Sequence, residues 1–305
     1  MPPRLLVIGG SGFIGQHVVK RGLSQGWQVT SLGMSIPKIT KTVHGANYIV
    51  GDFTQVNSLL QIANNQFDYV VNLGGYIDHT LFCNGGRRLI YSHFDGLLNL
   101  LEFLDRKCIK RFIQIGSSDE YGDAIAPQRE DLRECPISPY SLAKVASTHF
   151  LQMMWRTEKF PAVILRLFLT YGPGQDIKRF LPQIIKGFLR DMDVPVSKGE
   201  QLRDFCYVED VVCAIFLALH LDSVEGEIFN VGSGIPVSIK TMIEQVCSIV
   251  GKGRPKFGVI QYRSGENMAL FADTKKIFDR TGWMPKVSME LGLSKTIESM
   301  RGEHA

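Results

Sequence analysis

The chain has 305 residues, of which 45% are hydrophobic and 21% are charged, as is typical of a globular protein with a substantial core. The formal net charge is +4, and the lysines and arginines are spread along the sequence instead of forming one basic run. This distribution argues against a nucleic-acid partner. No apolar stretch is long enough to span a membrane, and the first residues lack a signal-peptide pattern, so we expect a cytoplasmic protein with no membrane partner.

The six cysteines show no Cys-x-x-Cys spacing. Several of them lie in apolar runs, which favours buried, reduced thiols over a zinc site or another metal site. They are Cys83, Cys108, Cys135, Cys206, Cys213 and Cys247.

Apolar runs and helical spacing alternate through the first half of the chain. Runs typical of buried strands cover residues 4–8, 27–32, 46–50, 68–73, 111–115 and 162–167. Helical spacing covers residues 13–23, 56–63, 97–104 and 139–155. This alternation predicts an α/β fold, a doubly wound parallel sheet of the Rossmann type with helices on both faces. In such sheets functional residues gather at the carboxyl ends of the strands, where this sequence has its glycine and serine clusters.

The rhythm changes after residue 170. Residues 171–175 read Tyr-Gly-Pro-Gly-Gln, a loop, and helix candidates then mix with short strands. We therefore expect a dinucleotide-binding Rossmann domain over residues 1–170, to which segments near 203–232 return. Residues 171–305 would form mainly a smaller, C-terminal α/β domain that binds the substrate.

A glycine-rich turn separates the first expected strand from the first expected helix. Gly9, Gly12 and Gly15 are spaced by three. Without side chains, these positions let backbone N–H groups approach a pyrophosphate at the helix N-terminus. The alternative is a tight turn between strand and helix that binds no ligand.

Two segments bear on the rest of such a cofactor. Asp52 follows the third strand, where it could accept a hydrogen bond from an adenine amino group or simply cap the next helix. After the second strand, the acidic residue that would hold a ribose 2′-hydroxyl is absent. Gly33, Ser35 and Lys38 lie there instead and would tolerate a 2′-phosphate, which favours NADP over NAD.

Tyr140 and Lys144 are four residues apart, so they lie on the same face of the helix expected there. An ammonium group in that position can stabilise the phenolate and lower the tyrosine pKa from its usual value of about 10. Such a pair predicts a general acid/base for oxidising an alcohol or reducing a ketone.

The glycine turn and the Tyr140–Lys144 pair belong to a series of short motifs that follow one another along the chain. They read Gly-Gly-Ser-Gly-Phe-Ile-Gly at 9–15, Gly-Ser-Ser-Asp-Glu-Tyr-Gly at 116–122 and Tyr-Ser-Leu-Ala-Lys at 140–144, and they continue at 165–168, 171–175, 203–210, 229–234 and 263–266. Together they resemble the extended short-chain dehydrogenase/reductase family, in its nucleotide-sugar epimerase, dehydratase and reductase branch. The likeness covers nearly the whole chain.

The resemblance implies the roles of individual residues. Tyr140 would exchange a proton with a sugar hydroxyl or ketone, Lys144 would support it and hold the nicotinamide ribose, and Ser117 would bond the reacting oxygen. The implied contacts of NAD or NADP, besides Tyr140 and Lys144, are Gly9, Gly12, Phe13, Ile14, Gly15, Ser35, Asp52, Phe53, Leu73, Gly74, Gly75 and Phe168. The implied contacts of a nucleotide-diphosphate sugar are Ser118, Asp119, Arg203, Arg263 and Glu266, with both arginines on the diphosphate.

Several residues depart from the family pattern. His93 stands where the family usually carries Asn, and it is interpreted as a packed helix residue. Leu169 replaces an Asn that would contact the substrate. Ser118 and Asp119 occupy the acid/base positions of a 4,6-dehydratase, with Asp where Glu is usual, although Asp119 and Glu120 could equally be loop carboxylates.

The sequence therefore predicts redox chemistry at C4 of a nucleotide-linked sugar, by a 4-epimerase or a 4-keto-sugar reductase. The alternative is a 4,6-dehydratase in which Asp119 and Glu120 assist elimination. A further alternative, a family member that only binds dinucleotide, is disfavoured because Ser117, Tyr140 and Lys144 are all present.

A homodimer is also expected. The helical segments 97–104 and 143–155 carry more apolar residues than one sheet face requires, and members of the family often pair these helices in a four-helix bundle. The alternative is that these residues are buried within one subunit.

Overall fold

The computed structural model describes residues 1–302 except 64, 263 and 264. Contacts divide the chain into two compact units. Unit 1 comprises Met1–Ala124, Leu132–Arg166 and Val212–Phe229, and unit 2 comprises Ile125–Asp131, Leu167–Val211 and the segment from Asn230 onward. Within these described residues, every helix is too short or too polar to cross a membrane.

Unit 1 is built on the larger sheet, whose strand order is β10-β6-β5-β4-β1-β2-β3. The strands are β1 (Arg4–Ile8), β2 (Gln28–Gly33), β3 (Asn47–Val50), β4 (Tyr69–Asn72), β5 (Arg111–Ser117), β6 (Ala162–Leu167) and β10 (Ile228–Val231). Neighbours from β3 through β5 pair in parallel. The predicted doubly wound α/β fold is therefore confirmed.

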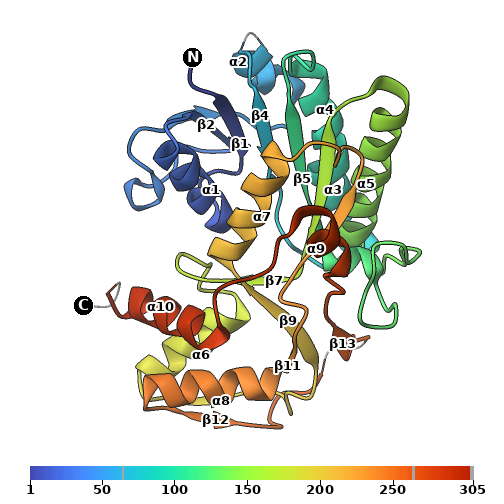
Figure 1. The fold of residues 1–305 in the computed structure, drawn as a ribbon. Helices are drawn as coiled ribbons and strands as arrows, with labels where there is room; N and C mark the ends of the chain where they lie inside the picture. The colour runs from blue at the N-terminus through green and yellow to red at the C-terminus, as the bar shows by residue number, and fades with distance from the viewer. Residues whose placement is uncertain (64, 263–264, 303–305) are drawn as a thin grey trace. The chain divides into compact units, whose positions relative to one another are not determined.

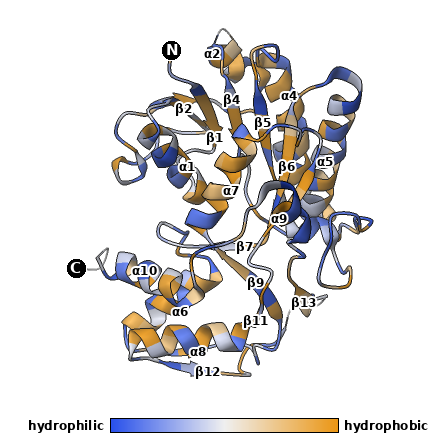
Figure 2. Cartoon of the chain, viewed as in Figure 1, coloured by the Kyte–Doolittle hydropathy of each residue, from blue (hydrophilic) through white to orange (hydrophobic). Residues whose placement is uncertain are grey.

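Helices cover both sides of this sheet (Figure 1). They are α1 (Phe13–Ser24), α2 (Leu60–Ala63), α3 (Arg87–Ile90), α4 (Gly96–Phe103), α5 (Pro139–Glu158) and most of α7 (Val208–His220), with short turns η1 (Ile39–Lys41), η2 (Val56–Leu59), η3 (Phe82–Asn84), η4 (Tyr91–Asp95) and η5 (Ser118–Tyr121). Strands β5 and β6 are buried along their whole length, as parallel strands between two helical layers must be. Their hydrophobic residues stand out in Figure 2.

Leucines of α4, together with its C-cap residue Leu104, pack in the core of unit 1. Leu97, Leu100, Leu101 and Leu104 are each at most 5% exposed and belong to one apolar cluster with Phe112 and neighbouring side chains. Burial within the subunit therefore accounts for these four leucines, and they supply no free surface for a partner.

Unit 2 has a smaller sheet around β9 (Leu202–Tyr207). β7 and β13 pair with β9 in parallel, whereas β11 is antiparallel to it. A separate ribbon joins β8 and β12, and α6 packs on α8. The bounds are β7 (Leu169–Tyr171), α6 (Phe180–Leu189), β8 (Asp193–Pro195), β11 (Pro236–Ser238), α8 (Ile239–Val250), β12 (Arg254–Lys256), β13 (Ala269–Leu270), α9 (Lys275–Thr281) and α10 (Met289–Gly302).

Residues 87–95 form α3 and the π-helical turn η4, in which Leu89 and His93 are buried. One expectation about local structure was wrong. The cysteines are free, but Cys83, Cys135 and Cys213 are exposed and Cys206 alone among the six is buried. An apolar run on an amphipathic helix still has one solvent face, which is why Cys213 on α7 lies outside the core.

Candidate active site

The glycine turn at the end of β1 forms an open cradle of backbone amides. Gly9 has φ +77°, and Gly12 caps α1 through its backbone alone. A Cβ atom on Gly15 would lie 2.1 Å from the Gly9 carbonyl oxygen, so a side chain has no room there. The first turn of α1 contains neither a capping side chain nor an acidic residue. Its N–H groups and positive dipole end therefore fit the pyrophosphate of a dinucleotide.

Other segments predicted to contact the cofactor end at the same edge of the sheet. A Cβ atom on Gly74 would lie 3.0 Å from the Phe53 ring, and one on Gly33 would lie 3.7 Å from Ser11 Oγ in the glycine turn. Asp52 Oδ1 accepts hydrogen bonds from the Thr54 N–H and hydroxyl at 2.9 and 2.7 Å. Asp52 therefore closes a local turn with Thr54, whereas Gln55 is the N-cap residue of η2. Asp52 does not cap the next helix, and its adenine contact stays a prediction.

Helix α5 presents Tyr140 and Lys144 at its first turns. Ser138 caps the helix in a reciprocal pair with Ser141, and Pro139 takes the first helical position. Tyr140 is 3% and Lys144 5% exposed. The Lys144 Nζ lies 5.8 Å from the Tyr140 ring centroid and donates a hydrogen bond to the Ile115 carbonyl at 2.8 Å. Burial lowers the pKa of Lys144 to about 8, although the charge of Glu120 opposes this shift.

Ser117 is oriented by the turn that follows β5. Its Oγ accepts from the Asp119 N–H at 3.1 Å, while its own N–H donates to Glu120 Oε1 at 2.8 Å. Because the oxygen already accepts one bond from the backbone, the hydroxyl proton is left to donate to a ligand. Lys144 bonds the carbonyl two residues before Ser117, so the helix and the serine turn are joined directly.

The two carboxylates of this turn differ sharply. Glu120 is fully buried, and both of its oxygens accept hydrogen bonds. The Asp119 side chain is 28% exposed, and its Oδ2 lies 3.8 Å from His79 Nε2. Of the two predicted acid/base candidates, Asp119 therefore has access to a ligand and Glu120 does not.

Two histidines flank Tyr140. The ring centroid of His93 lies 5.0 Å and that of His79 6.0 Å from the tyrosine ring, both edge to face. The sequence analysis did not predict His79 as a site residue. The one feature that could have indicated it is that a titratable side chain lies a few residues after a predicted strand, where functional residues gather. It follows β4 on a segment for which no element was predicted.

His93 is a neutral, buried side chain. Its Nε2 lies 2.9 Å from the Tyr76 carbonyl oxygen. Burial, with a smaller contribution from Lys144, lowers the pKa of His93 to about 3, so the ring is uncharged at neutral pH. The Nε2 must then carry the proton that it donates to Tyr76, which leaves Nδ1 bare. Among the described residues Nδ1 has no hydrogen-bond partner. His93 is therefore a packed residue of a helical turn, and its acceptor atom Nδ1 accepts no hydrogen bond among the described residues.

Unit 2 contains the predicted site residues Phe168, Arg203 and Glu266. Arg203 forms an ion pair with Glu266 and also donates to the Leu202 carbonyl at 2.8 Å, so two predicted substrate contacts lie together. Phe168 is 4% and Leu169 41% exposed. Arg263 lies outside the described residues.

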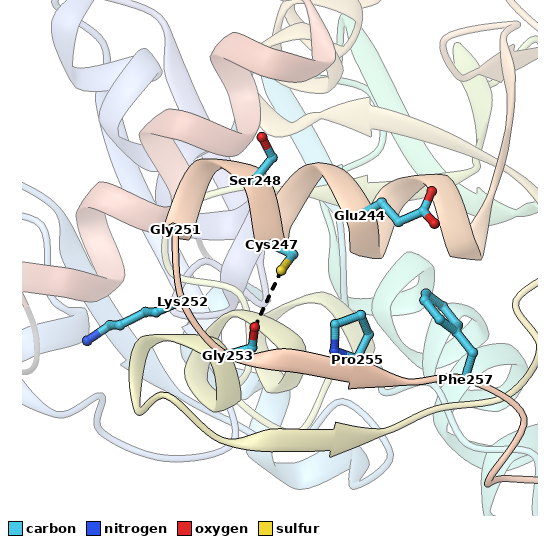
Figure 3. A pocket seen from close by; sticks show the side chains of 8 residues that line it. All are labelled: Glu244, Cys247, Ser248, Gly251, Lys252, Gly253, Pro255 and Phe257. Atoms are coloured by element: carbon cyan, nitrogen blue, oxygen red, sulfur yellow. Dashed lines mark hydrogen bonds between the residues drawn. The ribbon is translucent and has the colours of Figure 1, made fainter.

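A hollow on the surface of unit 2 is lined by none of the predicted site residues. It lies between α8 and β12 and is lined by Glu244, Cys247, Ser248, Gly251, Lys252, Gly253, Pro255 and Phe257 (Figure 3). Within it the Cys247 thiol donates to the Gly253 carbonyl at 3.5 Å.

Comparison with known proteins identifies the family. The model of the NAD dependent epimerase/dehydratase family matches residues 5–232. A dTDP-glucose 4,6-dehydratase from Haemophilus influenzae is 26% identical, over 96% of this chain and 96% of the relative. The structure of UDP-glucose 4-epimerase from Thermotoga maritima with UDP-glucose is similar with a TM-score of 0.91 and 28% identity, over 99% of this chain and 100% of that one.

A second solved structure is UDP-glucose 4-epimerase from Thermus thermophilus in complex with NAD. Its TM-score is 0.88 and its identity 26%, over 98% of this chain and 99% of that one. The resemblance predicted from the motifs is confirmed. Because the family model covers well over half of the sequence, the chain belongs to the NAD-dependent epimerase/dehydratase family of enzymes.

Proposed function

We propose that this chain catalyses NAD(P)-dependent oxidation and reduction at C4 of a nucleotide-diphosphate sugar, as a 4-epimerase or a 4-keto-sugar reductase. The observation that carries the proposal is the hydrogen bond from Lys144 to the Ile115 carbonyl of β5. This bond holds the helix that carries Tyr140 against the turn that carries Ser117. Relatives named as acting on UDP-glucose and dTDP-glucose support a nucleotide sugar as the substrate class.

The geometry of unit 1 supports the roles that the family resemblance implies. Ser117 donates its hydroxyl proton to the reacting sugar oxygen. Tyr140 removes the proton of that oxygen when the alcohol is oxidised and returns it when the ketone is reduced. Lys144 stabilises the phenolate and bonds the nicotinamide ribose, and the amides of the turn at Gly9, Gly12 and Gly15 hold the pyrophosphate. When bound, the dinucleotide supplies the hydride acceptor and donor.

Further contacts belong to the same proposal. Arg203 would pair with the substrate diphosphate in place of Glu266, and Arg263 would supply a second guanidinium. Phe53, Leu73, Gly74 and Gly75 would line the cofactor from the sheet edge, and the family resemblance adds Phe168 to its contacts. NADP is the cofactor that we propose, because the residues after β2 offer no carboxylate to a ribose 2′-hydroxyl.

A 4,6-dehydratase is the second candidate function. It is supported by the relatives named dTDP-glucose 4,6-dehydratase and by the partly exposed Asp119, whose carboxylate lies near His79. Elimination needs a proton donor besides Tyr140, and Asp119 would be that donor. Glu120 is excluded from this role by its burial.

The decisive variant is Tyr140→Phe, assayed on GDP-, CDP-, UDP- and dTDP-linked sugars with products identified by NMR. Losing the proton-transfer group should reduce kcat by about 10²- to 10⁴-fold. The affinity for dinucleotide, measured by calorimetry, should change little because the ring remains. Tyr69→Phe, on strand β4, is the matched control and should keep full turnover.

Turnover by Tyr140→Phe equal to that of the wild type would contradict the catalytic assignment. The NMR products separate the two candidate functions, because a 6-deoxy-4-keto sugar identifies a dehydratase and a C4 epimer identifies an epimerase.

A further inference from the structure

A buried carboxylate connects the serine turn to the helix that carries Tyr140. Glu120 Oε1 accepts the Ser117 N–H at 2.8 Å, and Oε2 accepts the Thr148 hydroxyl at 2.8 Å. Thr148 lies four residues after Lys144 and eight after Tyr140, so the three side chains share one face of α5. One side chain therefore spans the two elements that carry the proposed reacting groups.

An ion pair with Arg166 and the space left by Gly116 fix the position of the Glu120 carboxylate. The Arg166 Nε, itself fully buried, donates to Oε2 at 2.9 Å. A Cβ atom on Gly116 would lie 2.5 Å from Oε1, so the glycine leaves the space that the carboxylate occupies. Charge-assisted bonds of this kind are shorter and stronger than neutral ones. The glutamate consequently has no freedom to turn toward a ligand.

We propose that Glu120 is a positioning residue, which fixes the Ser117 hydroxyl relative to the Tyr140–Lys144 face of α5 so that both hydroxyls converge on one substrate oxygen. This inference rests on the proposed function. It assigns to Glu120 a task that acts through Ser117 and α5 instead of direct contact with the sugar.

The same carboxylate is the counter-charge of Lys144. The groups that surround Lys144 are Glu120 on η5, the neutral His93 on η4 and Tyr140 on its own helix, with Arg166 of β6 behind Glu120. Burial lowers the pKa of Lys144, and Glu120 raises it. Neutralising Glu120 therefore lowers the pKa of Lys144 below its present value of about 8.

Three variants test the proposal. Thr148→Val removes the bond to α5 without changing any charge, and we expect kcat to fall about tenfold with KM nearly constant, because a small misplacement of a reacting group is costly. Glu120→Gln should lose kcat in the same way. In addition, the alkaline decline of its kcat should move to lower pH, which a purely structural defect would not cause.

Glu134→Gln is the matched control. Glu134 binds the same Arg166, at 2.6 Å, and its other oxygen lies 3.4 Å from His149 Nε2, away from the bonds that link Glu120 to Ser117 and Thr148. Its kcat should stay within about twofold of the wild type, because no reacting group moves, and the alkaline decline should stay in place.

Amide hydrogen exchange of residues 116–121, read by mass spectrometry on the substrate-free protein, gives a measurement independent of turnover. Exchange should accelerate in Thr148→Val and Glu120→Gln but not in Glu134→Gln. Wild-type exchange in Thr148→Val, or its wild-type kcat, would overturn the proposal, and this variant decides alone where Glu120→Gln does not fold. If the wild type turns over no sugar nucleotide, the proposed function fails while the exchange result still tests the positioning role.

Discussion

At the scale of single residues, burial sets the protonation of His93. Its pKa is lowered to about 3, mainly by burial and also by Lys144, whereas an unfolded histidine has a pKa of about 6.5. Below pH 6.5 the unfolded chain binds a proton at this residue and the folded chain does not. Stability should therefore fall as pH decreases from 6.5 toward 3, by about 1.4 kcal/mol per pH unit within that window from this residue alone.

His93→Phe tests this expectation. A phenyl ring replaces the imidazole, so an aromatic side chain remains but the titrating group is lost. The free energy of unfolding should then depend less on pH between 6.5 and 4.5 than it does in the wild type. Urea denaturation of the dinucleotide-free protein at several pH values measures the slope. His44→Gln, at an exposed position, should leave the slope unchanged. Equal slopes for His93→Phe and the wild type would mean that His93 is protonated in the folded state.

At the scale of elements, we expect the segment after β2 to set the preference between NAD and NADP. Gly33 ends β2, and Ser35 and Lys38 are exposed beyond it. A lysine there can pair with a 2′-phosphate, but no carboxylate is available to a 2′-hydroxyl. We predict tighter binding of NADP than of NAD, by about tenfold for one such charge-assisted contact.

Calorimetric titration with both dinucleotides measures this preference. Lys38→Ala should weaken NADP binding and leave NAD binding unchanged, whereas Lys41→Ala, a nearby exposed lysine, should affect neither. If the purified protein releases tightly held NAD on denaturation, the preference and the reductase interpretation both fail.

The elements that were predicted well are those whose signal is local. The strands at 4–8 and 162–167 have the predicted bounds because each is a continuous apolar run. The helix predicted over 139–155 was found to continue to Glu158, where the chain is exposed and apolar spacing no longer marks the end. Tyr140 and Lys144 were identifiable because their spacing lies within one helix.

The contacts of Glu120 and His79 could not be predicted from the sequence, because distant segments form the surroundings of both residues. Arg166, which neutralises Glu120, comes from a strand 46 residues later. His79 meets Asp119 and Tyr140 only through the folding of the β4–η3 connection. The sequence near Glu120 or His79 therefore does not indicate these contacts.

At the scale of the whole molecule, helix α5 has one buried face and one face with exposed apolar side chains. Tyr140, Lys144 and Thr148 lie on the buried face. The opposite side carries Leu142 and Met153, which are 48% and 39% exposed and eleven residues apart, three helical turns along one stripe. Tyr91 on η4, which packs beside α5, is 41% exposed. Exposed apolar side chains gathered on one helix face are typical of a protein–protein interface.

We therefore predict that the chain forms a homodimer through the exposed face of α5. Light scattering at micromolar concentration should give twice the mass of one chain. The double variant Leu142→Glu, Met153→Glu should be monomeric, because closing the interface would bury two unpaired carboxylates. Leu60→Glu places the same charge on another leucine, which is 59% exposed on α2, and should leave the dimer intact. A wild-type protein with the mass of one chain would refute the dimer. A double variant that stays dimeric would show that the interface is not the exposed face of α5.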